Sequence, residues 1–153
     1  MSQLPNPSPT DEAVRISPVE WVAKQARAYE ESGGTRATTI HGAPCLLLDY
    51  RGRRSGAWHR TVLIYGRDAE SYLVVASNGG KDDDPLWFRC LEENPEVRLR
   101  VGTERFPAYA ETLSPEEKAR VWPHLTEVFA RWDTYQQNTS RDIPVVRLSR
   151  AQA

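Results

Sequence analysis

Short apolar runs separated by clusters of glycine, aspartate, asparagine and arginine constrain the fold of this chain more than any other feature of its sequence. Runs this short, with turn-forming residues at both ends, favour strands over helices. Within residues 97–101 apolar and basic side chains alternate strictly, so one face of that strand is expected to be buried and the other to meet water. The pattern predicts about six strands, over Cys45–Tyr50, Thr61–Tyr65, Tyr72–Ala76, Val97–Val101, Phe106–Thr112 and Ile143–Leu148.

A helix is predicted before the first of these strands. Ser17 can cap its first turn, Pro18 suits the first helical position, and Glu20 completes a capping box. The helix is expected to run to about Glu31, because Ser32-Gly33-Gly34 ends it. Its apolar residues lie near helical spacing and give it a modest apolar face; they are Trp21, Val22, Ala26 and Tyr29.

Two further helices are predicted between strands. Pro85–Glu93 follows an acidic turn and begins with the proline. Ser114 and Glu117 form a second capping box, which opens another helix. Pro123 lies inside that helix and is expected to kink or split it after Trp122, because proline lacks the N–H group that helix hydrogen bonding needs.

Strands of this length with short connections, and too little helix for a βαβ repeat, indicate an α+β fold: an antiparallel barrel with peripheral helices. The chain has 153 residues, close to the roughly 150 of one domain. Residues 1–16 are rich in proline and small polar residues and are expected to be a disordered tail. Residues 17–151 are then a single domain that begins with the N-terminal helix.

Charge and hydropathy exclude several classes of protein. Lys and Arg number 20 and Asp and Glu number 21, for a net charge of −1, whereas a nucleic-acid-binding domain is usually basic. No apolar run approaches the roughly 18 residues of a membrane span, and residues 1–30 lack the apolar stretch typical of a signal peptide, so we expect a cytoplasmic protein. The apolar face of the N-terminal helix could meet a membrane surface. Its polar face carries both signs of charge, which favours packing on the barrel.

Several catalytic motifs are absent from the sequence. It holds no G-x-S-x-G elbow, no G-x-x-x-x-G-K-[ST] loop and no G-x-G-x-x-G fingerprint. His41, His59 and His124 are far apart in the chain, so no metal site is expected. The two cysteines form no C-x-x-C pair, and Cys45, inside a strand run, is expected to be a small core residue.

The densest chemical signal is a basic connection between two predicted strands, residues 51–60. Its glycines let backbone N–H groups turn toward an anion, and its guanidinium groups can grip phosphate or carboxylate bidentately. A simply solvated hairpin would look the same by composition. The residues of interest are Arg51, Arg53, Arg54, Ser55, Gly56 and Arg60.

Two other segments could line a ligand site. Ser77-Asn78-Gly79-Gly80 ends an apolar strand and can bring backbone and hydroxyl groups close to a ligand, although a plain turn into the next helix is the simpler interpretation. The segment 132–141 gathers aromatic and hydroxyl side chains around Tyr135, which could form a wall for a flat ligand or simply pack the C-terminal part of the chain.

Taken in order, these segments resemble the deazaflavin-dependent nitroreductase family of actinobacteria, small split β-barrel proteins that use coenzyme F-420. The resemblance extends from about Gly42 to Leu148. It rests on Gly52-Arg53-Arg54-Ser55-Gly56 with Arg60, on Val75-Ala76-Ser77-Asn78-Gly79-Gly80, on Pro85-Leu86-Trp87-Phe88 with Leu91, Asn94, Pro95 and Val97, and on Tyr135-Gln136 with Thr139, Arg141, Ile143 and Pro144.

The resemblance implies an oxidoreductase that transfers a hydride from reduced F-420 to a small-molecule acceptor: a quinone, a nitroaromatic or an activated alkene. It implies Ser77 and Tyr135 as catalytic residues that act as orienting hydrogen-bond donors, with the proton coming from solvent or through one of them, and Phe129 and Trp132 as the wall of the acceptor site. The planar cofactor carries an anionic phosphodiester and oligoglutamate tail. The residues implied to bind it are Arg53, Arg54, Ser55, Gly56, Arg60, Ser77, Asn78, Gly79, Gly80, Trp87 and Tyr135.

The chain departs from the family pattern on both sides of the implied site. Asn78 stands where many relatives carry a lysine, so one charge toward the cofactor tail is missing. Phe129 and Trp132 stand where nitroimidazole-activating members carry tyrosines, which leaves only Tyr135 of that set. Barrels of this class often pair, so a homodimer is one expectation.

Two other functions stay open on the sequence alone. A split barrel could hold FMN or haem, as in neighbouring barrel families. A non-catalytic module could instead use the arginine loop to bind an acidic partner, with Trp58 as the anchor of the contact.

Overall fold

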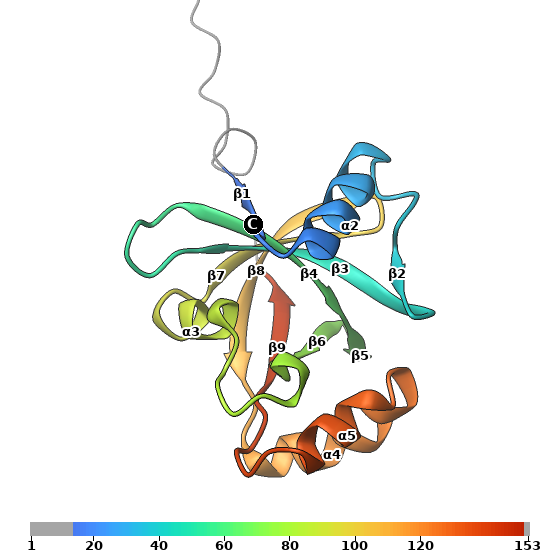
Figure 1. The fold of residues 1–153 in the computed structure, drawn as a ribbon, viewed down its shortest axis with the longest axis vertical. Coiled ribbons are helices and arrows are strands. Elements are labelled where there is room, and N and C mark those ends of the chain that lie inside the picture. Colours follow the sequence, from blue (N-terminus) through green and yellow to red (C-terminus); the bar gives the residue numbers. More distant parts are fainter. Residues whose placement is uncertain (1–13, 152–153) are drawn as a thin grey trace, which may run out of the picture.

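A computed structural model describes residues 14–151, which form a split, largely antiparallel barrel surrounded by helices (Figure 1). Within these residues one nine-stranded sheet runs in the order β1-β4-β3-β7-β8-β9-β6-β5, and β2 pairs with β3. Every strand pair is antiparallel except β1 with β4. The strands are β1 Arg15–Ile16, β2 Thr39–Ile40, β3 Ala43–Arg51, β4 Trp58–Ile64, β5 Gly66–Asp68, β6 Ser71–Val75, β7 Glu96–Val101, β8 Glu104–Thr112 and β9 Val145–Arg150.

The expected α+β barrel with peripheral helices is therefore confirmed. The six predicted strands correspond to β3, β4, β6, β7, β8 and β9, with ends that shift by at most three residues. The short strands β1, β2 and β5 were not predicted, because runs of two or three residues carry no readable alternation. The helices are α2 Glu20–Glu31, α3 Leu86–Glu93, α4 Pro115–Val128 and α5 Arg131–Gln137, with the 3-10 turn η1 at Asn78–Gly80.

The N-terminal segment differs from expectation in two ways. Arg15 and Ile16, placed in the tail by composition, instead form β1 opposite His59 and Arg60 of β4. Pairing continues into Ser17, whose N–H donates to the Arg60 carbonyl at 3.0 Å, so α2 begins only at Glu20. The Ser17 hydroxyl accepts from the Val19 N–H at 3.2 Å and does not cap the helix. Residues 1–13 of the expected tail lie outside the described residues.

The helix after Ser114 begins as predicted but does not end at its proline. Ser114 and Glu117 form the capping box, and α4 then continues through Pro123 to Val128. Proline removes one helix hydrogen bond, whereas the side chains on either side of it, Val121 and Leu125, are buried in the cluster that α4 shares with β6 and β9. That packing holds the helix together, and the chain breaks after residue 128 instead, before α5.

Three apolar clusters hold these elements together. The first fills the barrel interior, and the second joins β6 and β9 to α4 and α5. The third lies under α2, whose Tyr29 hydroxyl donates to the Cys45 carbonyl at 3.1 Å and accepts from the Gly102 N–H at 2.7 Å. Val22, Ala26 and Tyr29 of the predicted apolar face of α2 therefore pack on the barrel, whereas the fourth residue, Trp21, is 57% exposed. Within residues 14–151, none of the helices combines the length and apolarity of a membrane span.

Candidate active site

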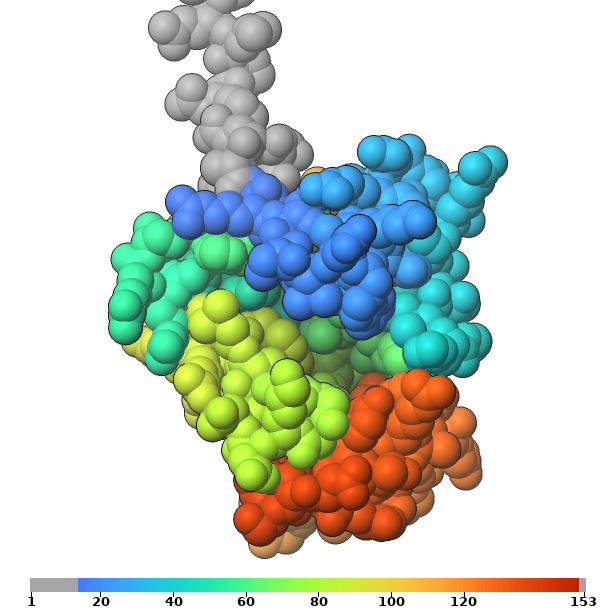
Figure 2. Space-filling model, viewed as in Figure 1, coloured from blue at the N-terminus to red at the C-terminus, as the bar shows by residue number. Residues whose placement is uncertain are grey.

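A cavity of about 730 Å³ opens on the face of the barrel between α2, the turn at residues 77–79, the start of α3, and α5. Figure 2 shows this hollow between α2 in blue, the segment around α3 in yellow-green and α5 in orange-red. A volume of this size lies in the range of small-molecule and cofactor sites, roughly 300–1,000 Å³. The cavity is therefore large enough for a flat organic ligand.

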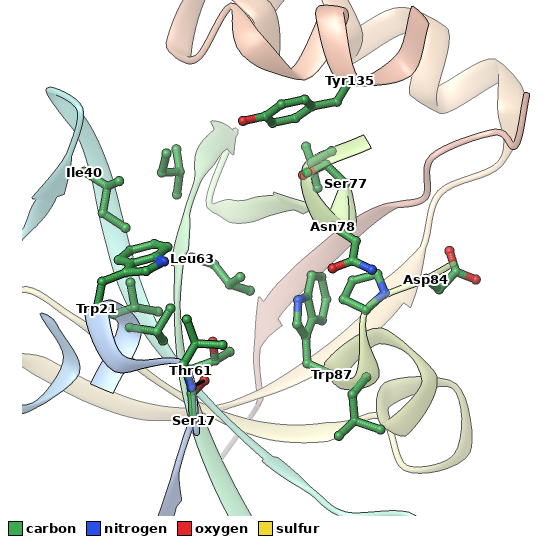
Figure 3. A pocket seen from close by; sticks show the side chains of 18 of the residues that line it. Ser17, Trp21, Ile40, Thr61, Leu63, Ser77, Asn78, Asp84, Trp87 and Tyr135 are labelled. Atoms are coloured by element: carbon green, nitrogen blue, oxygen red, sulfur yellow. Dashed lines mark hydrogen bonds between the residues drawn. The ribbon is translucent and has the colours of Figure 1, made fainter. Parts of the chain in front are cut away.

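Side chains from both halves of the chain face one another across the cavity (Figure 3). Trp21 of α2 lies on one side and Tyr135 of α5, with Ser77 beside it, lies on the other. Trp87 of α3 lies next to Asn78, and Thr61 of β4 also lines the cavity. Aromatic faces with a few hydroxyl and amide groups between them suit a planar, polar-edged ligand.

The turn that carries Ser77 is held against α5 by a close backbone approach. Gly80 has a φ of +83°, and a Cβ built on it would lie 3.2 Å from the Cα and the carbonyl oxygen of Tyr135. Asn78 and Gly79 also adopt positive φ, 48° and 65°. Glycine at position 80 thus allows the contact that brings Ser77 and Tyr135 to one side of the cavity.

Arg141 fixes the same turn from behind. Its Nη2 donates to the carbonyls of Ala76 and Ser77 at 3.2 and 2.9 Å, and its Nε donates to the carbonyl of Lys81 at 2.8 Å. Its Nη1 forms an ion pair with Asp84 at 2.8 Å. One guanidinium group therefore ties together the whole segment from the end of β6 to the start of α3.

The structure brings together most of the predicted site residues, though not all. Those that line the cavity are Ser77, Asn78, Gly79, Trp87, Phe129, Trp132 and Tyr135. Gly80 lies behind its wall, where it supports the turn. The predicted residues of the basic connection 51–60 lie outside the described cavity lining; they are Arg53, Arg54, Ser55, Gly56 and Arg60.

Arg60 lies on the other face of the sheet from the cavity. Side chains alternate along β4, so Arg60 points away from the side on which its neighbours His59 and Thr61 line the cavity. It is 8% exposed, and its Nε and Nη2 donate to the two carboxylate oxygens of Asp49 at 2.7 and 2.8 Å. Its Nη1 also pairs with Glu30 at 3.1 Å. The structure thus gives Arg60 a role in the fold and does not bring it to the other predicted ligands of the cofactor.

The remaining basic residues lie on an exposed hairpin loop between β3 and β4. The loop is closed by the Gly52 N–H, which donates to the Ala57 carbonyl at 2.8 Å, and Gly56 adopts a φ of 70°. Arg53 forms a long ion pair with Glu93 at 3.4 Å, and Arg54 is exposed. The loop joins β4 at Trp58, and the next residue, His59, lines the cavity.

Sequence reasoning did not predict the other residues that line the cavity, among them Arg15, Trp21, Tyr50, His59 and Arg131. Tyr50 and His59 are cross-strand partners whose rings stack at 5.5 Å, and burial raises the pKa of Tyr50 to about 12. Burial, together with the nearby Arg15, lowers the pKa of His59 below its usual 6.5. The alternation of β4 could have indicated that His59 shares a face with Thr61. Nothing local could have placed Arg15 or Arg131 at the cavity.

The charges around the cavity favour an anionic ligand. Among its described lining residues, Arg15 and Arg131 are cationic and Asp84 is the one carboxylate. Asp84 is already neutralised by Arg141 at 2.8 Å. A planar cofactor with a multiply anionic tail therefore fits this site in shape and in charge.

Comparison with known proteins agrees with this geometry. The family described as F420H(2)-dependent quinone reductase matches residues 21–150, and the chain belongs to that family. A Mycobacterium tuberculosis protein of that name is 40% identical over 126 residues, which cover 80% of this chain and 85% of the relative. The F-420-dependent reductase class and the cofactor expected from the sequence are thereby confirmed.

Two solved structures share the fold. One, described as an F420-H2 dependent reductase (FDR-A), is 29% identical with a TM-score of 0.65, over 72% of this chain and 100% of that chain. The other, described as a domain-swapped dimer, is 30% identical with a TM-score of 0.68, over 87% of this chain and 100% of that chain.

Proposed function

We propose that this protein reduces a quinone with reduced F-420 bound in the cavity between α2, α3 and α5. The observation that carries the proposal is the cavity itself, in which the Ser77 turn and Tyr135 meet and whose cationic side chains outnumber its carboxylates. Nitroaromatics and activated alkenes are electrophiles of similar flat shape, and we include them as further acceptors.

The cofactor would be held at two places. The turn at residues 77–79 and the ring of Trp87 would contact the deazaflavin ring system, because they lie next to each other in the cavity wall (Figure 3). The exposed loop would hold the anionic tail where it leaves the cavity beside His59, and its residues for this role are Arg53, Arg54, Ser55 and Gly56. This division follows the chemistry of the ligand, which is flat at one end and charged at the other.

When bound, reduced F-420 supplies a hydride, and one further proton completes the conversion of a quinone to a hydroquinone. The chain contributes orientation and hydrogen bonding. Ser77 and Tyr135 line the same side of the cavity, and either hydroxyl would donate to the oxygen on which negative charge develops. Trp21 and Leu86, both 57% exposed, flank the mouth and would exclude water once an acceptor is seated.

The test has a binding arm and a turnover arm. Titration of oxidised F-420 into the protein, followed by deazaflavin fluorescence, should show saturable binding at micromolar protein. Reduced F-420 should then be reoxidised by a naphthoquinone. Tyr135→Phe should lower kcat/KM about ten- to hundredfold, the effect of losing a hydrogen bond to a charged group, and leave cofactor affinity unchanged.

Tyr109→Phe is the matched control. This tyrosine is 53% exposed and lies outside the described cavity lining, so its variant should behave as wild type. Absence of saturable F-420 binding would overturn the proposal. Equal rates for Tyr135→Phe and wild type would remove Tyr135 from the catalytic residues.

We propose in addition that the chain forms a homodimer. The proposal is supported by the similarity to the structure described as a domain-swapped dimer. Light scattering of the purified protein would decide it, since a monomer mass at all concentrations contradicts the proposal.

A further inference from the structure

Two arginines mark opposite ends of the cavity. Arg15 of β1 is the cross-strand partner of His59, next to the arginine loop, and Arg131 opens α5 at the other end. β4 runs between them, beginning after the loop and ending at Ile64. If the anionic tail of F-420 occupies the loop end, Arg131 is left to face a second ligand, the acceptor.

Arg131 is held at the rim by two neighbours. Its Nη1 lies 3.5 Å from Nε2 of His41, and its guanidinium carbon lies 5.9 Å from the centre of the Phe129 ring. His41, in the turn between β2 and β3, stacks on that same ring at 6.3 Å. Because a guanidinium group can only donate, the His41 nitrogen is the acceptor of this contact.

The charge of Arg131 is not balanced by a carboxylate in the described part of the chain. Asp84, which also lines the cavity, is paired with Arg141. Asp133, two residues along α5, accepts from Trp122 Nε1 at 3.1 Å and from Gln137 Nε2 at 2.9 Å. A guanidinium group at the rim of an apolar site is well suited to bind an oxyanion.

The surroundings of Arg131 are flat and apolar. Phe129 contacts Trp132 edge-to-face at 5.4 Å and lies 6.4 Å from Tyr135, and Ile40 and Trp21 form the opposite wall. An aromatic acceptor would be sandwiched by these side chains with one edge toward the guanidinium group. The site thus combines a place for a ring with a single cation at its edge.

We propose that Arg131 makes this enzyme selective for flat acceptors that carry an anionic oxygen, such as hydroxyquinones ionised to their enolates, over neutral quinones of the same size. This inference rests on the proposed function, because it assigns the acceptor side of the same cavity. Arg131 acts as a specificity-determining residue, and the reduction itself does not depend on it.

The experiment uses two probes of matched size, 2-hydroxy-1,4-naphthoquinone, which is anionic at neutral pH, and 2-methoxy-1,4-naphthoquinone, which is neutral. The protein is first saturated with oxidised F-420, which cannot give a hydride, and acceptor binding is measured by calorimetry. Wild type should bind the hydroxyquinone more tightly. Arg131→Gln should weaken that binding about three- to fivefold, as for an exposed ion pair, and leave the methoxyquinone unchanged.

Arg131→Glu should go further and favour the methoxyquinone. Arg27→Gln and Arg27→Glu are the charge-matched controls, since Arg27 is exposed on α2 outside the described cavity lining. They should keep the wild-type preference. The ratio of kcat/KM for the two quinones should change in parallel with the binding ratio.

Equal affinity of wild type for both probes, or an unchanged preference in Arg131→Glu, would overturn the inference. In either case, normal F-420 titration and turnover of the methoxyquinone would leave the proposed function standing. Failure of F-420 to bind in the first titration would overturn both the proposed function and the inference about Arg131.

Discussion

Asp49 and Arg60 lie directly opposite each other on β3 and β4, and the guanidinium group of one holds the carboxylate of the other through two hydrogen bonds of 2.7 and 2.8 Å. The two residues are 4% and 8% exposed. Burial raises the pKa of the Asp49 carboxyl against the opposing effect of Arg60. Glu30 joins the pair from α2 at 3.1 Å, so the cluster also ties the helix to the barrel.

Arg60→Ala should therefore destabilise the fold by about 3–5 kcal/mol, because it leaves a buried carboxylate without its partner. Urea denaturation measures the change. Replacing both residues, as Arg60→Met with Asp49→Leu, should restore much of the lost stability, since an apolar pair needs no desolvation of charge. Arg27→Ala, on the exposed face of α2, should change stability by less than about 0.5 kcal/mol.

F-420 titration of the Arg60→Ala variant, under conditions in which it stays folded, should give wild-type affinity. A clear loss of affinity in the folded variant would show that Arg60 reaches the cofactor after all.

Gly80→Ala should weaken F-420 binding and turnover together. A Cβ at this position would lie 3.2 Å from the backbone of Tyr135, so the turn and α5 must move apart. Gly33→Ala is the control: its φ is also positive, at 67°, and nothing lies within 4 Å of the added atom. Both variants should lose about 1 kcal/mol of stability from the backbone, but only Gly80→Ala should alter the site. Identical kinetics in the two variants would contradict this assignment.

Arg141→Lys should lower F-420 affinity about tenfold or more while the chain stays folded. A lysine keeps the charge but cannot donate at once to three carbonyls and to Asp84, so the Ser77 turn loses its fixed shape. Arg120→Lys is the matched control, because Arg120 pairs with Asp68 on the surface, outside the described cavity lining. Equal F-420 affinities in the two variants would mean that the turn keeps its shape without the guanidinium fork.

The elements that were predicted correctly are those in which local pattern and burial agree. The strict alternation of residues 97–101 became β7, and the capping box at Ser114 opened α4. β1 escaped prediction because its two residues are held by cross-strand hydrogen bonds to β4, and no local pattern records a partner more than forty residues away. The predicted break of the helix at Pro123 was wrong for a similar reason, since the effect of this proline on α4 depends on tertiary packing.

In the candidate site, too, local motifs predicted some residues, whereas tertiary contacts decide the place of others. Ser77, Trp87 and Tyr135 were found through motifs, and the fold brings them to one cavity. Arg60 was predicted from another motif, the one at Gly52–Gly56, but strand alternation puts it on the other face of the sheet, with Asp49. Arg131 lies just before the segment that the sequence singled out for its aromatic residues, and its contact with His41 comes from a distant turn, which no local pattern records.

The thiols should be unreactive in the folded protein. Burial raises the pKa of Cys45 to about 11, so only about one molecule in a thousand carries the thiolate at pH 8. Both Cys45 and Cys90 are 2% exposed, which blocks reagents as well. Labelling with a disulfide reagent should be slow in buffer and complete for both thiols in urea. Rapid labelling of one thiol in buffer would mean that its part of the core opens.

The last prediction concerns His59 and the pH dependence of stability. Burial and the nearby Arg15 lower the pKa of His59 in the folded chain below the 6.5 expected for the unfolded chain. The unfolded chain therefore binds more protons as pH falls below 6.5, and the folded chain resists protonation. The contribution of His59 to stability is fully present above pH 6.5 and is lost as pH falls from there through the lowered pKa.

His59→Gln removes this contribution, so the free energy of unfolding should fall less steeply with acid in the variant than in wild type below pH 6.5. Urea denaturation at a series of pH values gives both curves, and their difference cancels the carboxylates that both proteins share. His124→Gln is the control, because His124 is exposed on α4 and its variant should follow the wild-type curve. Bound F-420 should oppose the effect, since a protonated His59 beside Arg15 adds positive charge where the anionic tail leaves the cavity. If the His59→Gln curve parallels the wild-type curve across this range, the imidazole is titrating as it would in water, and the packing of His59 against Tyr50 does not set its protonation.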